Sequence, residues 1–197
     1  MIQETYNNYT IQLIKENLDM PLDRLSFEYE SYLFPNTKPT GNYIQKHGIK
    51  IFEDGRLYKS TLLIHDEGGA TTIHKTCYLI FEDQLIICIG NYIMSFSIPD
   101  LNLQWSVKAD TASCFQLFKR KDFFIVHGEL SISKISYSGE LIWEFTGRDI
   151  FVLYGEEKES EVILFEDHIQ LIDFEKNLYK IDYDGKLLED IPYKAHA

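Results

Sequence analysis

Short apolar segments, each ended by a charged or glycine-containing turn, recur along the last two thirds of the chain. The segment 77–86 (CYLIFEDQLI) returns at 161–170 (EVILFEDHIQ), and two related apolar runs, 114–119 and 121–126, lie between them. In all three places an apolar run of strand length meets a charged turn and a second apolar run begins. This pattern is typical of a β-hairpin.

A second marker follows each of these turns at a nearly constant distance. The three copies of this marker are PDLNLQW at 99–105, YSGELIW at 137–143 and YDGKLLE at 183–189. The offset is 20 residues from Phe81 to Leu101 and 21 residues from Phe118 to Gly139. Because the two markers stay in step, the pattern predicts a repeated unit of four short strands.

The repeat predicts a single all-β domain over residues 1–197. Three clear units cover about 76–107, 113–145 and 160–191, and a fainter copy covers about 24–61. The fainter copy contains proline and glycine residues that weaken strands.

Four short antiparallel strands per unit are the signature of a propeller blade. A propeller closes with about four to eight blades, so two arrangements remain open. Either the N-terminal residues complete a four-bladed ring, or the meanders form an open or sandwich-like stack capped by the N-terminal segment. We favour the propeller-like arrangement of repeated four-stranded antiparallel meanders.

The segment from Gly139 to Trp143 resembles the tail of the quinoprotein-like repeat, a WD-like propeller repeat in which a glycine turn precedes an outer strand bearing tryptophan. Trp105 and Trp143 match that tryptophan, whereas Glu189 departs from it. The resemblance covers the last two thirds of the chain and implies a propeller-type fold, without an activity.

The chain is acidic, which bears on its partners. It has 19 Lys and Arg against 31 Asp and Glu, a formal net charge of -12. Such a charge repels nucleic acid and anionic membranes, so we expect neither as a partner. The acidic surface serves solubility, or it steers the chain toward a basic protein.

The cysteines and the N-terminus indicate the compartment. Cys77, Cys88 and Cys114 each lie within an apolar run and lack a paired ligand spacing, which is typical of reduced, buried thiols. The first residues lack the features of a secretory signal, and no apolar run is long enough to cross a bilayer. We therefore expect a cytoplasmic protein.

No catalytic motif is present, so the sequence predicts no catalytic residue, no cofactor and no metal. His65 and His74 flank an acidic glycine loop that could hold a metal, but we interpret it as a polar turn. Polar residues near strand ends, on one rim in the repeat register, are the candidate binding residues. They are His127, Glu129, Arg148, Asp149 and Asp173.

Three functions follow from these observations as hypotheses. The first is a non-enzymatic protein-binding module, in its specific form an acidic antidote-type partner of a basic protein. The second is a hydrolase or lyase acting on a glycan or small molecule, with His127, Glu129, Asp149 and Asp173 in one cleft. The third is a structural domain of a larger assembly. Convergence of those four side chains around a pocket would favour the enzyme.

Overall fold

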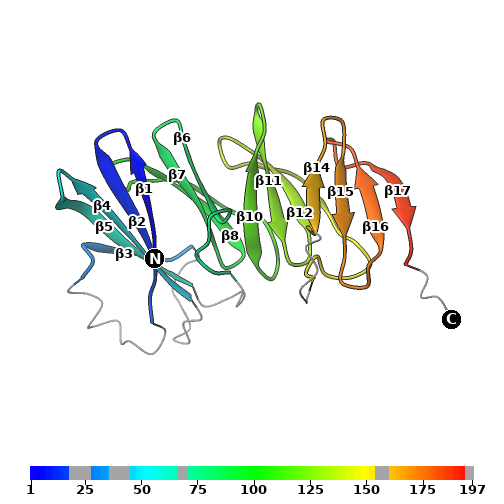
Figure 1. Cartoon of the computed structure of the whole chain (residues 1–197), viewed down its shortest axis with the longest axis horizontal. Coiled ribbons are helices and arrows are strands. Elements are labelled where there is room, and N and C mark those ends of the chain that lie inside the picture. The colour runs from blue at the N-terminus through cyan, green and yellow to red at the C-terminus, as the bar shows by residue number, and fades with distance from the viewer. Residues whose placement is uncertain (18–27, 36–44, 66–70, 154–159, 194–197) are drawn as a thin grey trace.

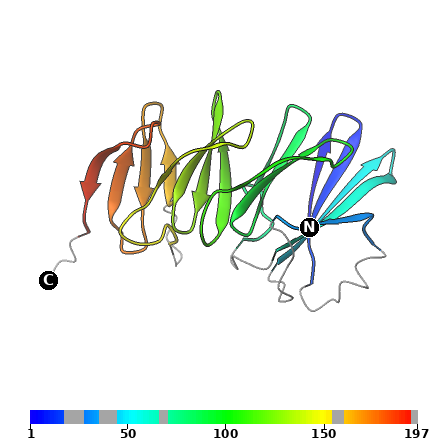
Figure 2. The same cartoon turned by 180° about the vertical axis from the view of Figure 1, so that it is seen from behind.

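A computed structural model of the chain describes residues 1–17, 28–35, 45–65, 71–153 and 160–193. These residues form β-strands in four sheets, which stand in a row from the N-terminus to the C-terminus (Figure 1). The view from behind shows the same order (Figure 2). We number the sheets 1 to 4 in chain order.

Sheets 2, 3 and 4 are four-stranded antiparallel meanders in which each strand pairs with the next along the chain. Sheet 2 consists of β6 (Tyr78–Phe81), β7 (Gln84–Ile89), β8 (Tyr92–Ser97) and β9 (Leu103–Lys108). Sheet 3 consists of β10 (Cys114–Lys119), β11 (Phe123–Gly128), β12 (Ile132–Ser136) and β13 (Leu141–Phe145). Sheet 4 consists of β14 (Val162–Leu164), β15 (Ile169–Ile172), β16 (Leu178–Ile181) and β17 (Leu187–Ile191). The predicted fold class, all-β with repeated four-stranded meanders, is confirmed.

Sheet 1 has a fifth strand, and its first two strands lie before the unit predicted at 24–61. It consists of β1 (Ile2–Tyr6), β2 (Tyr9–Lys15), β4 (Gln45–Glu53), β5 (Arg56–His65) and β3 (Ser31–Leu33). The strand order is β1-β2-β4-β5-β3, and β3 runs parallel to β5. The first hairpin therefore comes from residues 2–15, whereas residues 31–33 only extend the edge. Residues 24–27 and 36–44 lie outside the described residues.

The last two strands of the four meanders share one irregularity. The register shifts once in each pair, between Ile51 and Phe52, Ser95 and Phe96, Lys134 and Ile135, and Lys180 and Ile181. A bulge of this kind increases the local twist and re-aims side chains. The shift also shows which residues of the four sheets are equivalent. In each sheet, the last residue before the shift pairs with one residue of the final strand. These paired residues are Lys59, Trp105, Trp143 and Glu189, in the order of sheets 1 to 4.

The tryptophan ring at this position packs against the glycine turn of the following sheet. A Cβ atom at Gly139 would lie 2.6 Å from Trp105 Cδ2, and one at Gly185 would lie 2.8 Å from Trp143 Cδ2. Trp143 Nε1 also donates a hydrogen bond to the Tyr183 carbonyl at 3.1 Å. The tryptophan and the glycine therefore form a repeated contact between neighbouring sheets.

The apolar core is continuous between neighbouring sheets. One cluster joins sheets 1, 2 and 3 through residues such as Ile49, Ile87 and Phe124. A second cluster joins sheets 3 and 4 through residues such as Ile125 and Leu171. All three cysteines are buried and free, and burial raises the pKa of the Cys77 thiol to about 11.

The two terminal sheets lie at opposite ends of the row (Figure 1), so the four sheets form an open array. On sheet 1, Tyr29 lies across the outer face, where a Cβ atom at Gly48 would lie 1.8 Å from the tyrosine hydroxyl. Tyr29 packs there with Leu62 and Ile64.

The outer face of sheet 4 carries an ion pair where sheets 2 and 3 carry tryptophan. Lys180 Nζ lies 2.5 Å from Glu189 Oε2, and Glu189 occupies the position of Trp105 and Trp143. The end of the array therefore presents a charged pair in place of a ring that could receive another glycine turn. Terminal repeats commonly carry such a polar outer face.

Candidate binding sites

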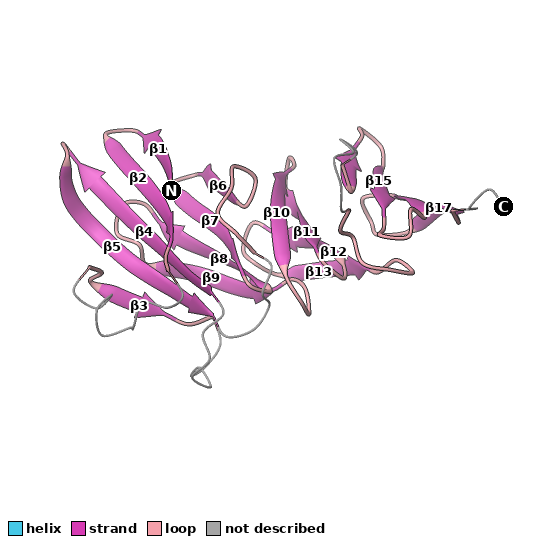
Figure 3. Cartoon of the chain, turned by 60° about the horizontal axis from the view of Figure 1, so that its bottom comes forward, coloured by secondary structure: helices cyan, strands magenta, loops and turns pink. Residues whose placement is uncertain are grey.

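The meander topology separates the turns into two rims. In an antiparallel sheet of strands a, b, c and d, the a–b and c–d turns lie at one end and the b–c turn lies at the other. The first group forms what we call the upper rim, at the top in Figure 1, and the second group lies on the lower rim. Figure 3 shows the direction across the strands of each sheet. The first strands, β6 and β10, lie toward one side of the molecule, and the last strands, β9 and β13, lie toward the other.

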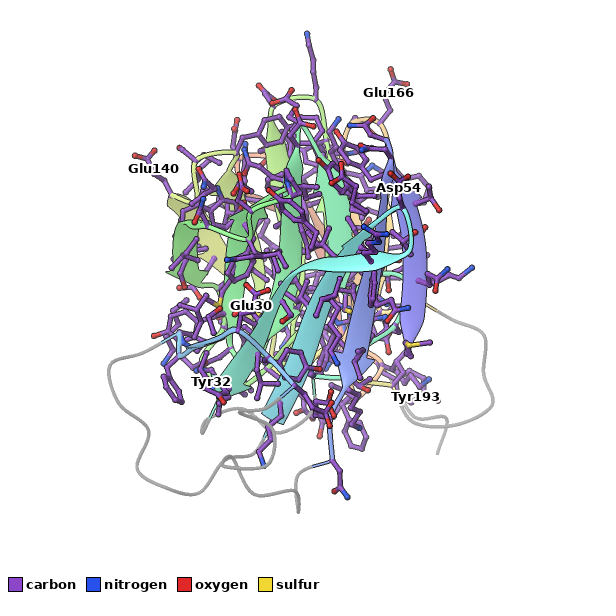
Figure 4. The ribbon with its side chains drawn as sticks, turned by 90° about the vertical axis from the view of Figure 1, so that its left-hand side faces the viewer. Glu30, Tyr32, Asp54, Glu140, Glu166 and Tyr193 are labelled. Atoms are coloured by element: carbon purple, nitrogen blue, oxygen red, sulfur yellow. The ribbon has the colours of Figure 1, made fainter. Side chains whose placement is uncertain are left out.

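The upper rim is acidic along the whole array. Its exposed carboxylates are Asp54, Glu82, Asp83, Asp100, Asp122, Glu140, Glu166, Asp167 and Asp184. Figure 4 shows Asp54, Glu140 and Glu166, from sheets 1, 3 and 4, on the upper part of the molecule. All four sheets contribute at least one of these side chains.

Most carboxylates of the upper rim lack an ion-pair partner among the described residues, whereas Asp167 lies 2.7 Å from His168 Nδ1. Within the described part of the chain, the ion pairs of Lys and Arg side chains join Lys50 to Glu28, Lys59 to Glu30, Arg148 to Asp190 and Lys180 to Glu189. None of these acidic residues belongs to the upper rim. Arg120 is also on that rim, and its guanidinium donates hydrogen bonds to the Phe165 carbonyl and the Tyr183 hydroxyl. The same turns carry the exposed basic residues Arg56, Lys121 and Lys186. The exposed carboxylates outnumber these basic side chains, so the rim keeps a net negative charge.

A small cavity lies on the lower rim, where sheet 3 meets the segment before sheet 2 and the connection to sheet 4. Its volume is about 220 Å³. It is lined by His74, Phe115, Gln116, His127, Phe151, Val152 and Glu161.

His127 lines this cavity, and one of its ring nitrogens has no hydrogen-bond partner among the described residues. The side chain is buried, and its Nε2 lies 2.8 Å from the Phe151 carbonyl. Because a carbonyl only accepts, Nε2 carries the proton, and Nδ1 of the neutral ring is an acceptor. Nδ1 is buried and lacks a hydrogen-bond partner among the described residues. Burial lowers the pKa of His127, which keeps the ring neutral.

Two further ionisable groups line the same cavity. Glu161 is half-buried, and its Oε1 accepts a hydrogen bond from the Leu153 amide at 3.2 Å. His74 Nδ1 lies 3.0 Å from the Thr76 hydroxyl, and burial lowers the pKa of this imidazole. The cavity thus combines a carboxylate, a bare imidazole nitrogen and aromatic walls.

The five residues predicted from sequence do not form one cluster. His127 alone lines the cavity. Arg148 donates two hydrogen bonds to Asp190, at 2.5 and 2.6 Å, and Asp149 accepts one from the Ile150 amide at 2.8 Å. The Glu129 amide donates to the Ser113 carbonyl at 2.7 Å. These contacts order turns of the lower rim.

Asp173 is fully buried and fully hydrogen-bonded. Its carboxylate accepts from the Asn177 amide and side chain, at 2.9 to 3.1 Å, and from the Tyr179 hydroxyl at 2.7 Å. The same hydroxyl accepts from the Arg148 amide at 2.9 Å, which links Arg148 to Asp173. Because these partners occupy the carboxylate, Asp173 is not an orienting group for His127.

Sequence reasoning missed Asp110, a second heavily hydrogen-bonded carboxylate of the lower rim. It is buried and accepts from the Ala112 amide at 2.6 Å. It also accepts from the Leu130 amide at 2.9 Å, and from the Ser131 amide and hydroxyl at 2.8 and 3.0 Å. Asp110 therefore ties the end of sheet 2 to the β11–β12 turn. A local signal existed, since Asp before two small residues favours an Asx-turn.

The predicted metal loop falls partly outside the described residues, which omit 66–70. Within the described part of the chain, no group of three or more His, Cys, Asp or Glu side chains is placed to hold a metal ion. The same residues include no helix of the length and hydrophobicity that a bilayer crossing requires.

The stability of the protein is expected to fall as the pH decreases from about 6.5 to 4. His47 is buried in β4, and burial together with nearby Lys15 lowers its pKa to about 4, against about 6.5 in an unfolded chain. In this window the unfolded chain binds the proton and the native chain does not, so acid favours unfolding. The loss approaches about 3 kcal/mol for His47, and the lowered pKa of His127 acts in the same direction.

Urea unfolding at pH 7.5, 6 and 5 measures this effect. A His47→Leu variant should show a weaker pH dependence than the wild type over this range, because the titrating group is absent. An equal dependence in the two proteins would contradict the assignment to His47.

The strand topology assigns the chain to the propeller-like class of all-β repeat folds, here as an open row of four blade-like sheets. No protein-family model and no curated protein matches the chain.

Several solved structures are similar to the chain. The WD40 domain of Neurospora crassa Pan2 is 14% identical with a TM-score of 0.47, over 60% of this chain and 38% of that one. BamB from Moraxella catarrhalis is 10% identical with a TM-score of 0.47, over 75% and 43%. The computationally designed Ika8 protein is 9% identical with a TM-score of 0.47, over 95% and 60%. The chain spans less than half of the first two structures, and we define its fold by its own sheet order.

Proposed function

We propose that the chain is a non-enzymatic protein-binding module that contacts a basic partner through its upper rim. The observation that carries this proposal is the excess of exposed carboxylates over basic side chains on the upper-rim turns, with carboxylates from all four sheets. In its specific form the module is an antidote-type partner that covers a basic surface of another protein.

Electrostatics explain how such a rim would work. Carboxylates of one sign along an extended edge create a potential that attracts a basic protein and orients it before contact. Exposed charges are screened over about 8 Å at physiological ionic strength. The association rate is therefore expected to fall steeply with added salt.

The hydrolase or lyase hypothesis lacks geometric support. Of its four residues, only His127 lines the cavity. The carboxylate of Asp173 is occupied by Asn177 and Tyr179. No described pair of these residues forms the hydrogen-bonded base and orienting acid that the reaction would need.

A charge-neutralisation experiment tests the proposed function. A partner is captured from native lysate at low salt and purified, and its association rate is measured with two triple variants of equal net charge. Glu82→Gln, Glu140→Gln and Glu166→Gln neutralise the upper rim. Glu129→Gln, Glu144→Gln and Glu175→Gln neutralise the same number of charges elsewhere.

The rim variant should associate about tenfold more slowly than the wild type, and the control variant should remain within about twofold of it. Equal slowing of both variants would show that net charge alone acts and would contradict a binding rim. The absence of any reproducible partner at low salt would also count against the proposal.

A further inference from the structure

The cavity on the lower rim has a chemistry of its own, separate from the acidic turns of the upper rim. We propose that it binds a guanidinium or primary ammonium group, carried either by a small molecule or by a side chain of a peptide.

The first argument is the unpaired nitrogen of His127. Its Nε2 proton is committed to the Phe151 carbonyl, so only the lone pair of Nδ1 remains for a ligand. A buried polar atom without a partner is costly, and this one belongs to a side chain that lines a cavity. A ligand that donates a hydrogen bond removes this cost, and a ligand that only accepts does not.

The second argument is charge. Glu161 lines the same cavity and uses one carboxylate oxygen to accept from the Leu153 amide. Its second oxygen has no hydrogen bond within the described part of the chain. The negative charges of Glu161 and Asp110 both act on His127. A carboxylate beside a neutral acceptor favours a cationic donor and disfavours an anion.

The third argument is the shape and lining of the cavity. Phe115 meets His127 edge to face with ring centroids 5.4 Å apart, and the fully buried Phe151 also lines the cavity. Aromatic rings attract organic cations and cover an alkyl stem. A volume of about 220 Å³ is below the range of about 300–1,000 Å³ for drug-sized ligands, so it suits a cationic head group with a short stem.

Calorimetric titration of the full chain tests the proposal with matched ligand pairs. Propylguanidinium is compared with propylurea, a neutral molecule of nearly the same shape. Acetyl-Gly-Arg-Gly-amide is compared with the same peptide containing citrulline. We expect saturable binding of the cations, at concentrations on the order of 1 mM for the small ligand, and at least tenfold weaker binding of the neutral analogues. The tighter of the two cationic ligands identifies the source of the group.

Two variants locate the site. Glu161→Gln keeps an oxygen for the Leu153 amide but removes the charge, and it should weaken binding about tenfold. Glu166→Gln makes the same change on the upper rim and should leave binding within about twofold of the wild type. Equal affinity of Glu161→Gln and wild type, equal binding of cation and neutral analogue, or no saturable binding would each overturn the proposal. None of these results depends on a basic protein partner, so the two proposals fail separately.

Discussion

Replacement of Asp110 by alanine is expected to lower the free energy of unfolding by about 4 kcal/mol, because it leaves several donors of the lower rim without an acceptor. The carboxylate accepts from the amides of Ala112, Leu130 and Ser131 and from the Ser131 hydroxyl. Each buried donor without a partner costs about 1–3 kcal/mol. The shift of the urea unfolding midpoint measures the loss.

Asp149 provides a matched control for this prediction. It is half-buried, and its side chain accepts one local hydrogen bond from the Ile150 amide. Asp149→Ala should therefore cost less than about 1 kcal/mol. Asp110→Asn, which keeps one acceptor oxygen, should fall between the two alanine variants. If Asp110→Ala and Asp149→Ala shifted the midpoint equally, Asp110 would not be the link between sheets 2 and 3.

Replacement of Gly139 by alanine is expected to cost about 3 kcal/mol, for two separate reasons. The backbone of Gly139 has φ of 82°, a conformation that disfavours any Cβ atom. The Cβ atom would also lie 2.6 Å from the Trp105 ring, so sheets 2 and 3 would have to move apart.

Gly55 separates these two contributions. It has φ of 76° in the equivalent turn of sheet 1, and a Cβ atom there would meet no atom within 4 Å. Gly55→Ala should therefore cost only about 1 kcal/mol, the backbone part alone. Urea unfolding of both variants gives the cost of the clash as a difference. Equal losses at Gly55 and Gly139 would show that the contact with Trp105 does not stabilise the array.

The sequence predicts the meanders well because the signals within them are local. In sheet 2 the Glu82-Asp83 turn separates two apolar runs that pair directly, with Phe81 opposite Gln84. Strand alternation and turn residues depend on only a few neighbouring positions, so the sequence alone is enough to predict these strands and turns. The same holds in sheet 4, where the Asp184-Gly185 turn joins β16 to β17.

The N-terminal sheet could not be predicted in the same way. Its second strand pairs with β4 through contacts such as Leu13 with Ile49, which lie far apart in the sequence. The fainter repeat copy predicted at about 24–61 includes residues 31–33, yet this segment pairs in parallel with β5 at the edge of the sheet. Tyr32 packs against the small cluster that contains Tyr29, and Leu33 packs against the main core.

The candidate sites show the same division between local and distant contacts. His127 could be chosen as a polar residue at a strand end, but Glu161 belongs to a charged run that reads as an exposed loop. Only the docking of sheet 4 on sheet 3 brings Glu161 to the cavity. Asp173 was misleading because its partner Asn177 is only four positions away, so a local turn already satisfies it.

The contact between a tryptophan and the following glycine turn has a direction, because each inner sheet offers a ring on one side and a turn on the other. Units joined by a directional contact can add to one another without limit and build filaments when both of their ends stay competent. At sheet 4 Glu189, paired with Lys180, stands in place of the ring, so the C-terminal end of the array lacks the receiving half of the contact. The turn of Gly55 in sheet 1 is open, but head-to-tail growth through this contact would also need a ring at the position of Glu189.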